Sequence, residues 1–189
     1  MSHAAPRIAP LDPPYAPEIQ GSFDAIMKGR DPLILFRTVA TSARAWTKFR
    51  AGSLLDRGPL SLRDREIVID RTTALADCEY EWGVHVAVYA KPANLTDAQV
   101  AATRNAPSTA SCWSEAEQAL IAAVDALHHR ATLDRGEFDR LHAHYDDAQI
   151  LEILMLCGFY RTVSYIANAL NLPLEPMARR FPVPTHSET

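Results

Sequence analysis

The sequence predicts an all-α, multi-helix bundle, and three observations support this fold class. Apolar residues recur at the 3.6-residue spacing of amphipathic helices along most of the chain. No segment alternates apolar and polar residues between hairpin turns, as strands would. The 189 residues suit one domain, and a chain of this length buries about 70% of its unfolded surface. A hydrophobic core can therefore hold the fold without disulfides.

We expect the chain to divide into an arm, one domain and a tail. Residues 1–17 are rich in proline and predict an extended arm that packs across a surface. Residues 18–181 predict a single helical domain, and residues 182–189 a flexible tail.

Two helices are expected before residue 52. The first runs from Pro17 to Lys28 and stops at Gly29. The second begins at Pro32, because the fixed φ of proline suits a first helical turn. Apolar residues keep the helical period as far as Ala51, so we expect one continuous helix there.

The next two helices form a pair. Ser61 can cap the first of them, because its hydroxyl can accept a backbone N–H of the first turn. That helix runs to Ala76. The second begins near Cys78 and ends at Ala90, ahead of a proline that disfavours helical geometry in its predecessor.

Three further helices begin at capping boxes, in which an N-cap side chain and a side chain three residues later satisfy each other's backbone N–H groups. The boxes and the expected ends of these helices are Thr96 and Gln99 to Asn105, Ser114 and Glu117 to Arg130, and Asp134 and Glu137 to Tyr145. A long apolar helix from Asp147 to Leu170 then completes the bundle as its core helix.

The candidate functional residues lie on the paired helices. Cys78, Glu81 and His85 are spaced i, i+3, i+7, so they project within roughly 60° of one another on one helix face. Glu66 precedes Cys78 by twelve residues, and a tight connection near Asp77 can fold its carboxylate toward the same face. The pattern predicts a site that combines a thiol, an imidazole and two carboxylates.

Each of these residues also has an interpretation without catalysis. Cys78 sits at a helix N-terminus, where the partial positive charge favours a thiolate, but it also suits an inert buried position. Glu81 and His85 can form an ordinary i, i+4 pair. Glu66 can pair with a neighbouring arginine, and His85 can be a histidine satisfied by a carboxylate at an interface.

Composition excludes several classes of function. The 19 basic and 23 acidic residues give a net charge of −4, and no basic run offers a nucleic-acid surface. The longest uncharged apolar run, Ile153 to Tyr160, is far shorter than the roughly 20 residues that span a bilayer. The N-terminus has no apolar signal segment. We therefore expect a cytoplasmic protein that binds neither nucleic acid nor membrane.

We also expect no metal and no cofactor. The three cysteines contain no C-x-x-C pair, and the two histidine pairs do not converge on a helix. Glu66, Glu81 and His85 can converge, but zinc and iron sites usually contain more imidazole or thiolate ligands.

The central stretch resembles the carboxymuconolactone decarboxylase and alkylhydroperoxidase-D-like superfamily. Its signature couples an upstream Glu to C-x-x-C-x-x-x-H, and Glu66, Cys78 and His85 fit those spacings. Glu81 stands in place of the second cysteine, and E-Y-E-W-G-V-H is similar to a decarboxylase-like branch of this family. The likeness extends to 120–128, 158–161 and 168–170. It implies a helical homo-oligomer, a trimer or hexamer with a dimer as the alternative, and a site near a subunit boundary.

The resemblance implies an enzyme that decarboxylates a small carboxylated lactone or a related acid of aromatic catabolism. His85 is the expected acid that protonates carbon, oriented by Glu81 or Glu66. The residues expected to bind the small-molecule substrate are Arg65, Arg71 and Trp82.

Two alternatives stay open. A thiol peroxidase would attack with Cys78 and use His85 and Glu66 as a proton relay. Because position 81 has no cysteine, an external thiol would have to reduce the oxidised Cys78. The other alternative is a non-catalytic oligomer that binds a small ligand.

Overall fold

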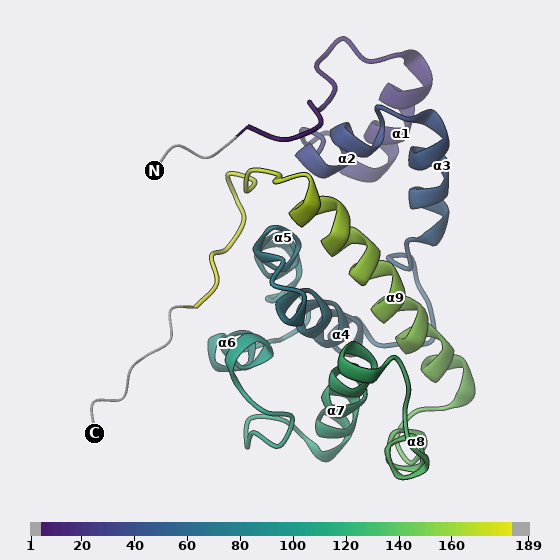
Figure 1. Cartoon of the computed structure of the whole chain (residues 1–189), viewed down its shortest axis with the longest axis vertical. Coiled ribbons are helices and arrows are strands. Elements are labelled where there is room, and N and C mark those ends of the chain that lie inside the picture. Colours follow the sequence, from purple (N-terminus) through teal and green to yellow (C-terminus); the bar gives the residue numbers. More distant parts are fainter. Residues whose placement is uncertain (1–4, 183–189) are drawn as a thin grey trace.

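The computed structural model describes residues 5–182, and this part of the chain is all helical with no strand (Figure 1). Its helices are α1 (Pro17–Met27), α2 (Ile34–Val39), α3 (Ala43–Gly52), α4 (Leu62–Leu75), α5 (Glu79–Tyr89), α6 (Asp97–Asn105), α7 (Glu115–Arg130), α8 (Arg135–His142) and α9 (Asp147–Ala169). The predicted all-α bundle is confirmed.

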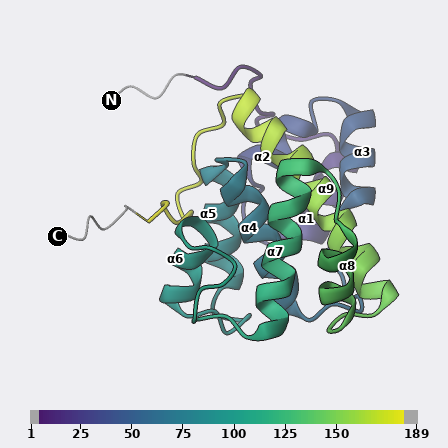
Figure 2. The same cartoon turned by 60° about the horizontal axis from the view of Figure 1, so that its bottom comes forward.

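Helix α4 lies at the centre of the bundle, in contact with α5, α6, α7 and α9 (Figures 1 and 2). Every residue from Glu66 to Ala74 is buried, whereas a surface helix buries only one stripe. The side chains of this stretch, polar ones included, are therefore enclosed on all sides and held in fixed positions.

The helix starts follow the predicted capping chemistry. Ser61 accepts the backbone N–H of Asp64, and complete capping boxes begin α6 at Thr96, α7 at Ser114 and α8 at Asp134. Each such cap stabilises its helix by about 0.5–2 kcal/mol. Local hydrogen bonds thus fix most of the boundaries.

The single helix expected from Pro32 to Ala51 is wrong. The chain forms α2 and α3 instead, with a break between Val39 and Ala43. Thr41 donates its hydroxyl to the Thr38 carbonyl, and Ser42 is extended and accepts the N–H of Ala45. Hydroxyl side chains compete with helical hydrogen bonding in this way. The break turns α3 so that it packs beside α2.

Residues 5–16 and the segment after α9 run along the surface of the bundle. The backbone N–H of Arg7 donates to Leu170 O at 2.9 Å, and that of Leu11 donates to Arg37 O at 3.2 Å. The segment after α9 crosses α5 at Gly83, where an added Cβ would lie 2.2 Å from the carbonyl oxygen of Arg179. Only glycine allows this close crossing. Residues 1–4 of the predicted arm and 183–189 of the predicted tail lie outside the described residues.

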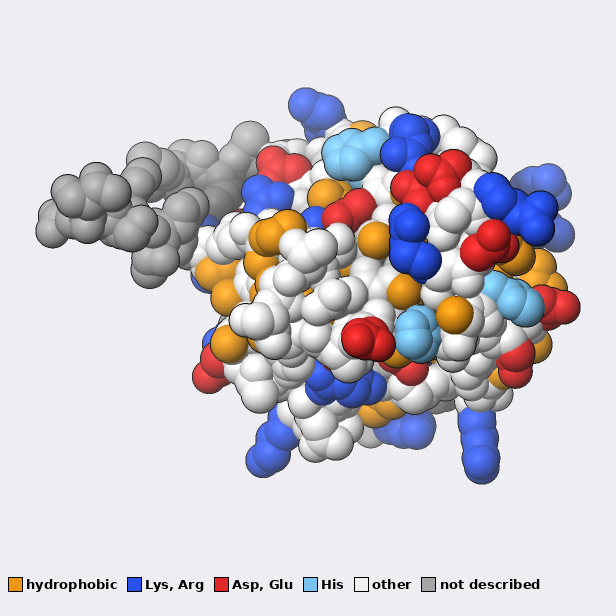
Figure 3. Space-filling model, turned by 90° about the horizontal axis from the view of Figure 1, so that it is seen from below, with side chains coloured by type: hydrophobic (Ala, Val, Ile, Leu, Met, Phe, Trp, Pro, Cys, Tyr) orange, Lys and Arg blue, Asp and Glu red, His pale blue; other side chains and the backbone are white. Residues whose placement is uncertain are grey.

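Helix α9 is long and apolar enough, by length and composition, to cross a membrane, with a mean hydropathy of 1.4. Core helices of soluble proteins share these properties, and α9 packs one face against α4. Positive and negative side chains are interspersed on the face in Figure 3, which therefore presents no stripe of one sign.

Candidate active site

Two carboxylates and an imidazole meet where α4 packs against α5. Asp77 adopts a left-handed conformation, with φ 54°, and reverses the chain between these helices. Glu66 Oε2 lies 2.7 Å from His85 Nδ1, and Glu81 Oε1 lies 3.4 Å from His85 Nε2. Arg65 Nε donates to Glu66 Oε1 at 3.0 Å. The turn predicted near Asp77 therefore does bring Glu66 to the face of Glu81 and His85.

The surroundings of His85 favour its protonated form. Its side chain is nearly fully buried, and burial acts to lower the pKa of an imidazole. The carboxylates of Glu66 and Glu81 outweigh burial and raise the pKa of His85 well above its ordinary value of 6.5. The two carboxylates therefore favour the form in which both ring nitrogens carry a proton. The short contact fixes Nδ1, whereas the looser contact of Nε2 leaves its proton available to a ligand.

His85 and Glu81 form part of the wall of a cavity of about 310 Å³. Six aromatic rings line this cavity, and they come from four helices: Phe36, Trp46, Phe49, Tyr89, Phe159 and Tyr160. Arg30 and Arg50 also line it. A mostly apolar pocket with a few convergent polar groups is the usual form of a small-molecule site. We call it the His85 cavity.

Helix α2, one wall of the His85 cavity, is tied to α5 by Tyr80. The backbone N–H of Leu35 donates to the Tyr80 hydroxyl at 3.0 Å, and this hydroxyl donates to the carboxylate of Glu175. The cavity is thus partly preformed by hydrogen bonds outside it.

Of the two interpretations of Cys78, a thiolate at a helix N-terminus and an inert buried thiol, the structure supports the second. Cys78 does stand at the N-cap of α5, but it is fully buried and does not line the His85 cavity. Burial raises the pKa of its thiol to about 11, and the backbone N–H groups of Glu81 and Tyr80 offset this only in part. Desolvation exceeds the effect of the helix N-terminus here, so the group is a neutral thiol near neutral pH.

Two of the three predicted substrate-binding residues lie elsewhere. Arg71 forms a bidentate pair with Asp125, at 2.6 and 2.9 Å, which explains its burial at the core. Trp82 is buried, and its Nε1 donates to Thr103 Oγ1 at 3.0 Å. Arg65 stays beside the site but is already paired with Glu66. None of the three lines the His85 cavity, so we remove them from the substrate-binding set.

Asp70 belongs to the site although sequence reasoning assigned it no role. It lies one helical turn after Glu66 and is 1% exposed, and neither carboxyl oxygen has a hydrogen-bond partner in the described part of the chain. Burial, and then the charge of Glu66, raise its pKa well above the ordinary value. Its surroundings therefore favour the neutral acid. The sequence does indicate this position, because Asp70 follows Glu66 by four residues and so lies on the same face of the helix.

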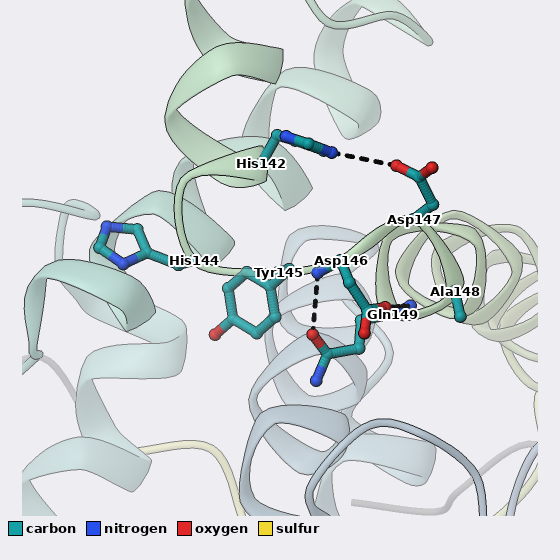
Figure 4. Close-up of a pocket in the computed structure, with 7 residues that line it drawn as sticks. All are labelled: His142, His144, Tyr145, Asp146, Asp147, Ala148 and Gln149. Atoms are coloured by element: carbon teal, nitrogen blue, oxygen red, sulfur yellow. Dashed lines mark hydrogen bonds and ion pairs between the residues drawn. The ribbon is translucent and has the colours of Figure 1, made fainter.

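The side chains of His142 and His144 do not point toward a common position, as predicted. Both residues line an open depression of about 620 Å³ between α8 and α9, with Asp146 and Asp147. Figure 4 shows that His142 points to Asp147, to which its Nε2 is 3.0 Å away, while the ring of His144 lies on the other side of Tyr145. Among residues 5–182, no group of three or more His, Cys, Asp or Glu side chains is arranged to hold a metal ion.

Comparisons with known proteins agree with this fold. Uncharacterized peroxidase-related proteins from Ralstonia eutropha JMP134 and Silicibacter sp. TM1040 superpose with TM-scores of 0.77 and 0.76 at 16% and 17% identity. The first match covers 93% of this chain and 95% of that one, and the second covers 91% and 94%. The debrominase Bmp8 bound to 2,3,4-tribromopyrrole has a TM-score of 0.73 at 18% identity, over 90% of this chain and 92% of that one. The fold therefore carries at least one enzyme.

The sequence itself matches a family model. Residues 40–125 match the carboxymuconolactone decarboxylase family, and this segment contains Glu66, Cys78, Glu81 and His85. A comparison with curated proteins gives no match. The family match is thus confined to the segment that carries α4 and α5, and the solved structures show that the whole described chain shares their fold.

Proposed function

We propose that this protein is a carboxy-lyase that removes carbon dioxide from a small, mostly apolar ring acid or carboxylated lactone. One observation carries the proposal: the imidazole of His85 lies in the wall of an apolar cavity between two carboxylates, which raise its pKa well above the ordinary value. Loss of carbon dioxide leaves an electron pair that must receive a proton on carbon, and a positioned imidazolium supplies one. Glu66 orients His85 through Nδ1, so the Nε2 proton is the one transferred.

The charges at the His85 cavity favour an anionic substrate. Arg30 and Arg50 line it, and neither has an ion-pair partner among residues 5–182. Glu81 is the only acidic side chain in the lining drawn from these residues, and it faces His85. The Arg50 guanidinium lies 5.8 Å from the centre of the Trp46 ring. An arginine packed on an aromatic ring can receive a carboxylate whose own ring rests on the aromatic wall.

We expect Arg50→Gln to weaken the binding of benzoate by about threefold to tenfold, because Arg50 is exposed and water screens its charge. Benzyl alcohol, which has no charge, should bind both forms equally. Isothermal titration measures both affinities. Arg44→Gln is the matched control, since Arg44 lies on the same helix but does not line the cavity. Equal loss of benzoate binding in both variants would refute a specific role for Arg50.

The proposal itself is tested by carbon dioxide release from small carboxylated lactones and unsaturated ring acids. If the purified chain releases none and reduces hydroperoxides with an external thiol instead, the peroxidase alternative replaces it. The buried, neutral thiol of Cys78 disfavours that alternative, because the thiolate is the attacking form. Ligand binding with neither activity would favour a non-catalytic binding protein.

We also propose that the chain forms a homo-oligomer through α9. This helix exposes large apolar side chains, which on monomeric proteins are normally scattered singly. They are Leu151, Leu154, Met155 and Tyr165. Sedimentation should give a multiple of 20.9 kDa, and Met155→Glu should shift it toward the monomer. A wild-type monomer at micromolar concentration would contradict this assembly.

A further inference from the structure

Tyr160 is a buried phenol beside His85 that the reaction as described does not use. It lies on α9, is 1% exposed and lines the His85 cavity. Its ring stands perpendicular to the imidazole of His85, with 5.0 Å between the two centres. Because α9 packs along α4, the position of this ring is fixed by the core.

Within residues 5–182, the contacts of the Tyr160 side chain are made by its ring, with His85 and Phe159, and no protein group forms a hydrogen bond with its hydroxyl. Because Tyr160 lines the cavity, a ligand there is the natural acceptor for this hydroxyl. Burial, and then the nearby charge of Glu81, raise the pKa of Tyr160 well above its ordinary value. The group therefore remains a neutral phenol that can donate its proton in a hydrogen bond.

The proposed decarboxylation needs such a donor. When the bond to the departing carboxylate breaks, the electron pair moves toward a carbonyl and its oxygen becomes negative. Donors already aimed at that oxygen lower the barrier strongly in a water-poor site. The carboxylates of Glu66 and Glu81 can only accept hydrogen bonds, and the guanidinium of Arg65 is already paired with Glu66.

We propose that Tyr160 is a further catalytic residue, whose hydroxyl donates a hydrogen bond to the oxyanion that forms as carbon dioxide leaves. This inference rests on the proposed function. The carbon–carbon bond to the carboxylate breaks, its electron pair forms a carbon–carbon double bond, and the carbonyl becomes an enolate oxygen bound to Tyr160. Carbon dioxide departs. His85 then transfers its Nε2 proton to carbon, the carbonyl re-forms, and solvent returns a proton to His85.

The test uses 4-nitrophenol, whose ionised form is a stable oxyanion on a ring that fits the cavity and whose absorbance reports ionisation. We expect Tyr160→Phe to weaken binding of 4-nitrophenolate about tenfold or more, which is the usual contribution of a hydrogen bond to a charged group. Binding of 4-nitrotoluene, which has the same ring without the oxyanion, should not change. Thr162→Val is the control, because it removes an exposed hydroxyl from the same helix at a position that does not line the cavity.

Unchanged binding of the phenolate by Tyr160→Phe would overturn the inference, and so would failure of the wild-type protein to bind it. Loss of 4-nitrotoluene binding as well would show that the substitution disturbs the cavity rather than a hydrogen bond, which also counts against it. Failure of the proposed function would look different. Carbon dioxide release would then be absent, while the binding of 4-nitrophenolate would still differ between Tyr160→Phe and Thr162→Val.

Discussion

His85→Ala should lose carbon dioxide release by about 10²-fold or more, the usual contribution of a positioned general acid. His85 is the only cationic group of the cavity wall, among the described residues, that carries a transferable proton near neutral pH. His85→Gln removes the same proton with a smaller change in shape and should lose a similar amount. Initial rates of carbon dioxide release measure the effect. His129→Ala, an exposed histidine outside the cavity, should keep the wild-type rate.

Cys78→Ser should keep most of that activity, because the thiol is buried, neutral and absent from the cavity lining. A larger loss of activity in Cys78→Ser than in His85→Ala would contradict the lyase account. A peroxidase would lose hydroperoxide reduction entirely at Cys78→Ser and would only be slowed at His85→Ala. Rapid labelling of Cys78 by iodoacetamide in the folded protein would also contradict a neutral buried thiol.

Glu66→Ala should lower the free energy of unfolding by about 3–5 kcal/mol, the usual result of removing one partner of a buried ion pair. Glu66 is 1% exposed and is the common partner of Arg65 and His85, so its loss leaves Arg65 without its anion and His85 with only the looser contact to Glu81. Urea denaturation followed by circular dichroism measures the change. Glu115→Ala, at an exposed position of α7, should change stability by less than about 0.5 kcal/mol.

The stability that Glu66 provides should depend on pH. The folded pKa of His85 is raised, so this contribution is fully present below pH 6.5 and is lost as pH rises through the folded pKa. The wild-type free energy of unfolding should therefore fall on the alkaline side, and this fall should be smaller in Glu66→Ala. Equal pH dependence in both proteins would show that the pair is not charged.

Features fixed by local chemistry could be predicted from the sequence. The boxes at Thr96, Ser114 and Asp134 satisfy backbone groups within four residues, so their pattern alone gives the starts of α6, α7 and α8. The spacing of Glu81 and His85 likewise places both side chains on one face of α5. Glu66 lies on the preceding helix, and the chain reversal near Asp77 is enough to bring it to that face.

Features fixed by tertiary packing could not be predicted in this way. The break at Ser42 directs Trp46 and Arg50 into the cavity wall, and no local pattern says which helices meet there. The pKa of Cys78 depends on how deeply α5 is buried, because burial raises this pKa by more than the backbone N–H groups at the N-cap lower it. The sequence predicts that Arg71 binds the substrate, because its actual partner, Asp125, is distant in sequence and forms no local pattern with it.

The measurement that tests this account most directly is ¹⁵N NMR of the His85 imidazole near neutral pH. The His85→Gln variant assigns its signals. We expect both ring nitrogens to be protonated, and to remain so as pH rises past 6.5, because Glu66 and Glu81 hold the imidazolium. A neutral ring with one unprotonated nitrogen at that pH would contradict the central claim that His85 is the acid of this site.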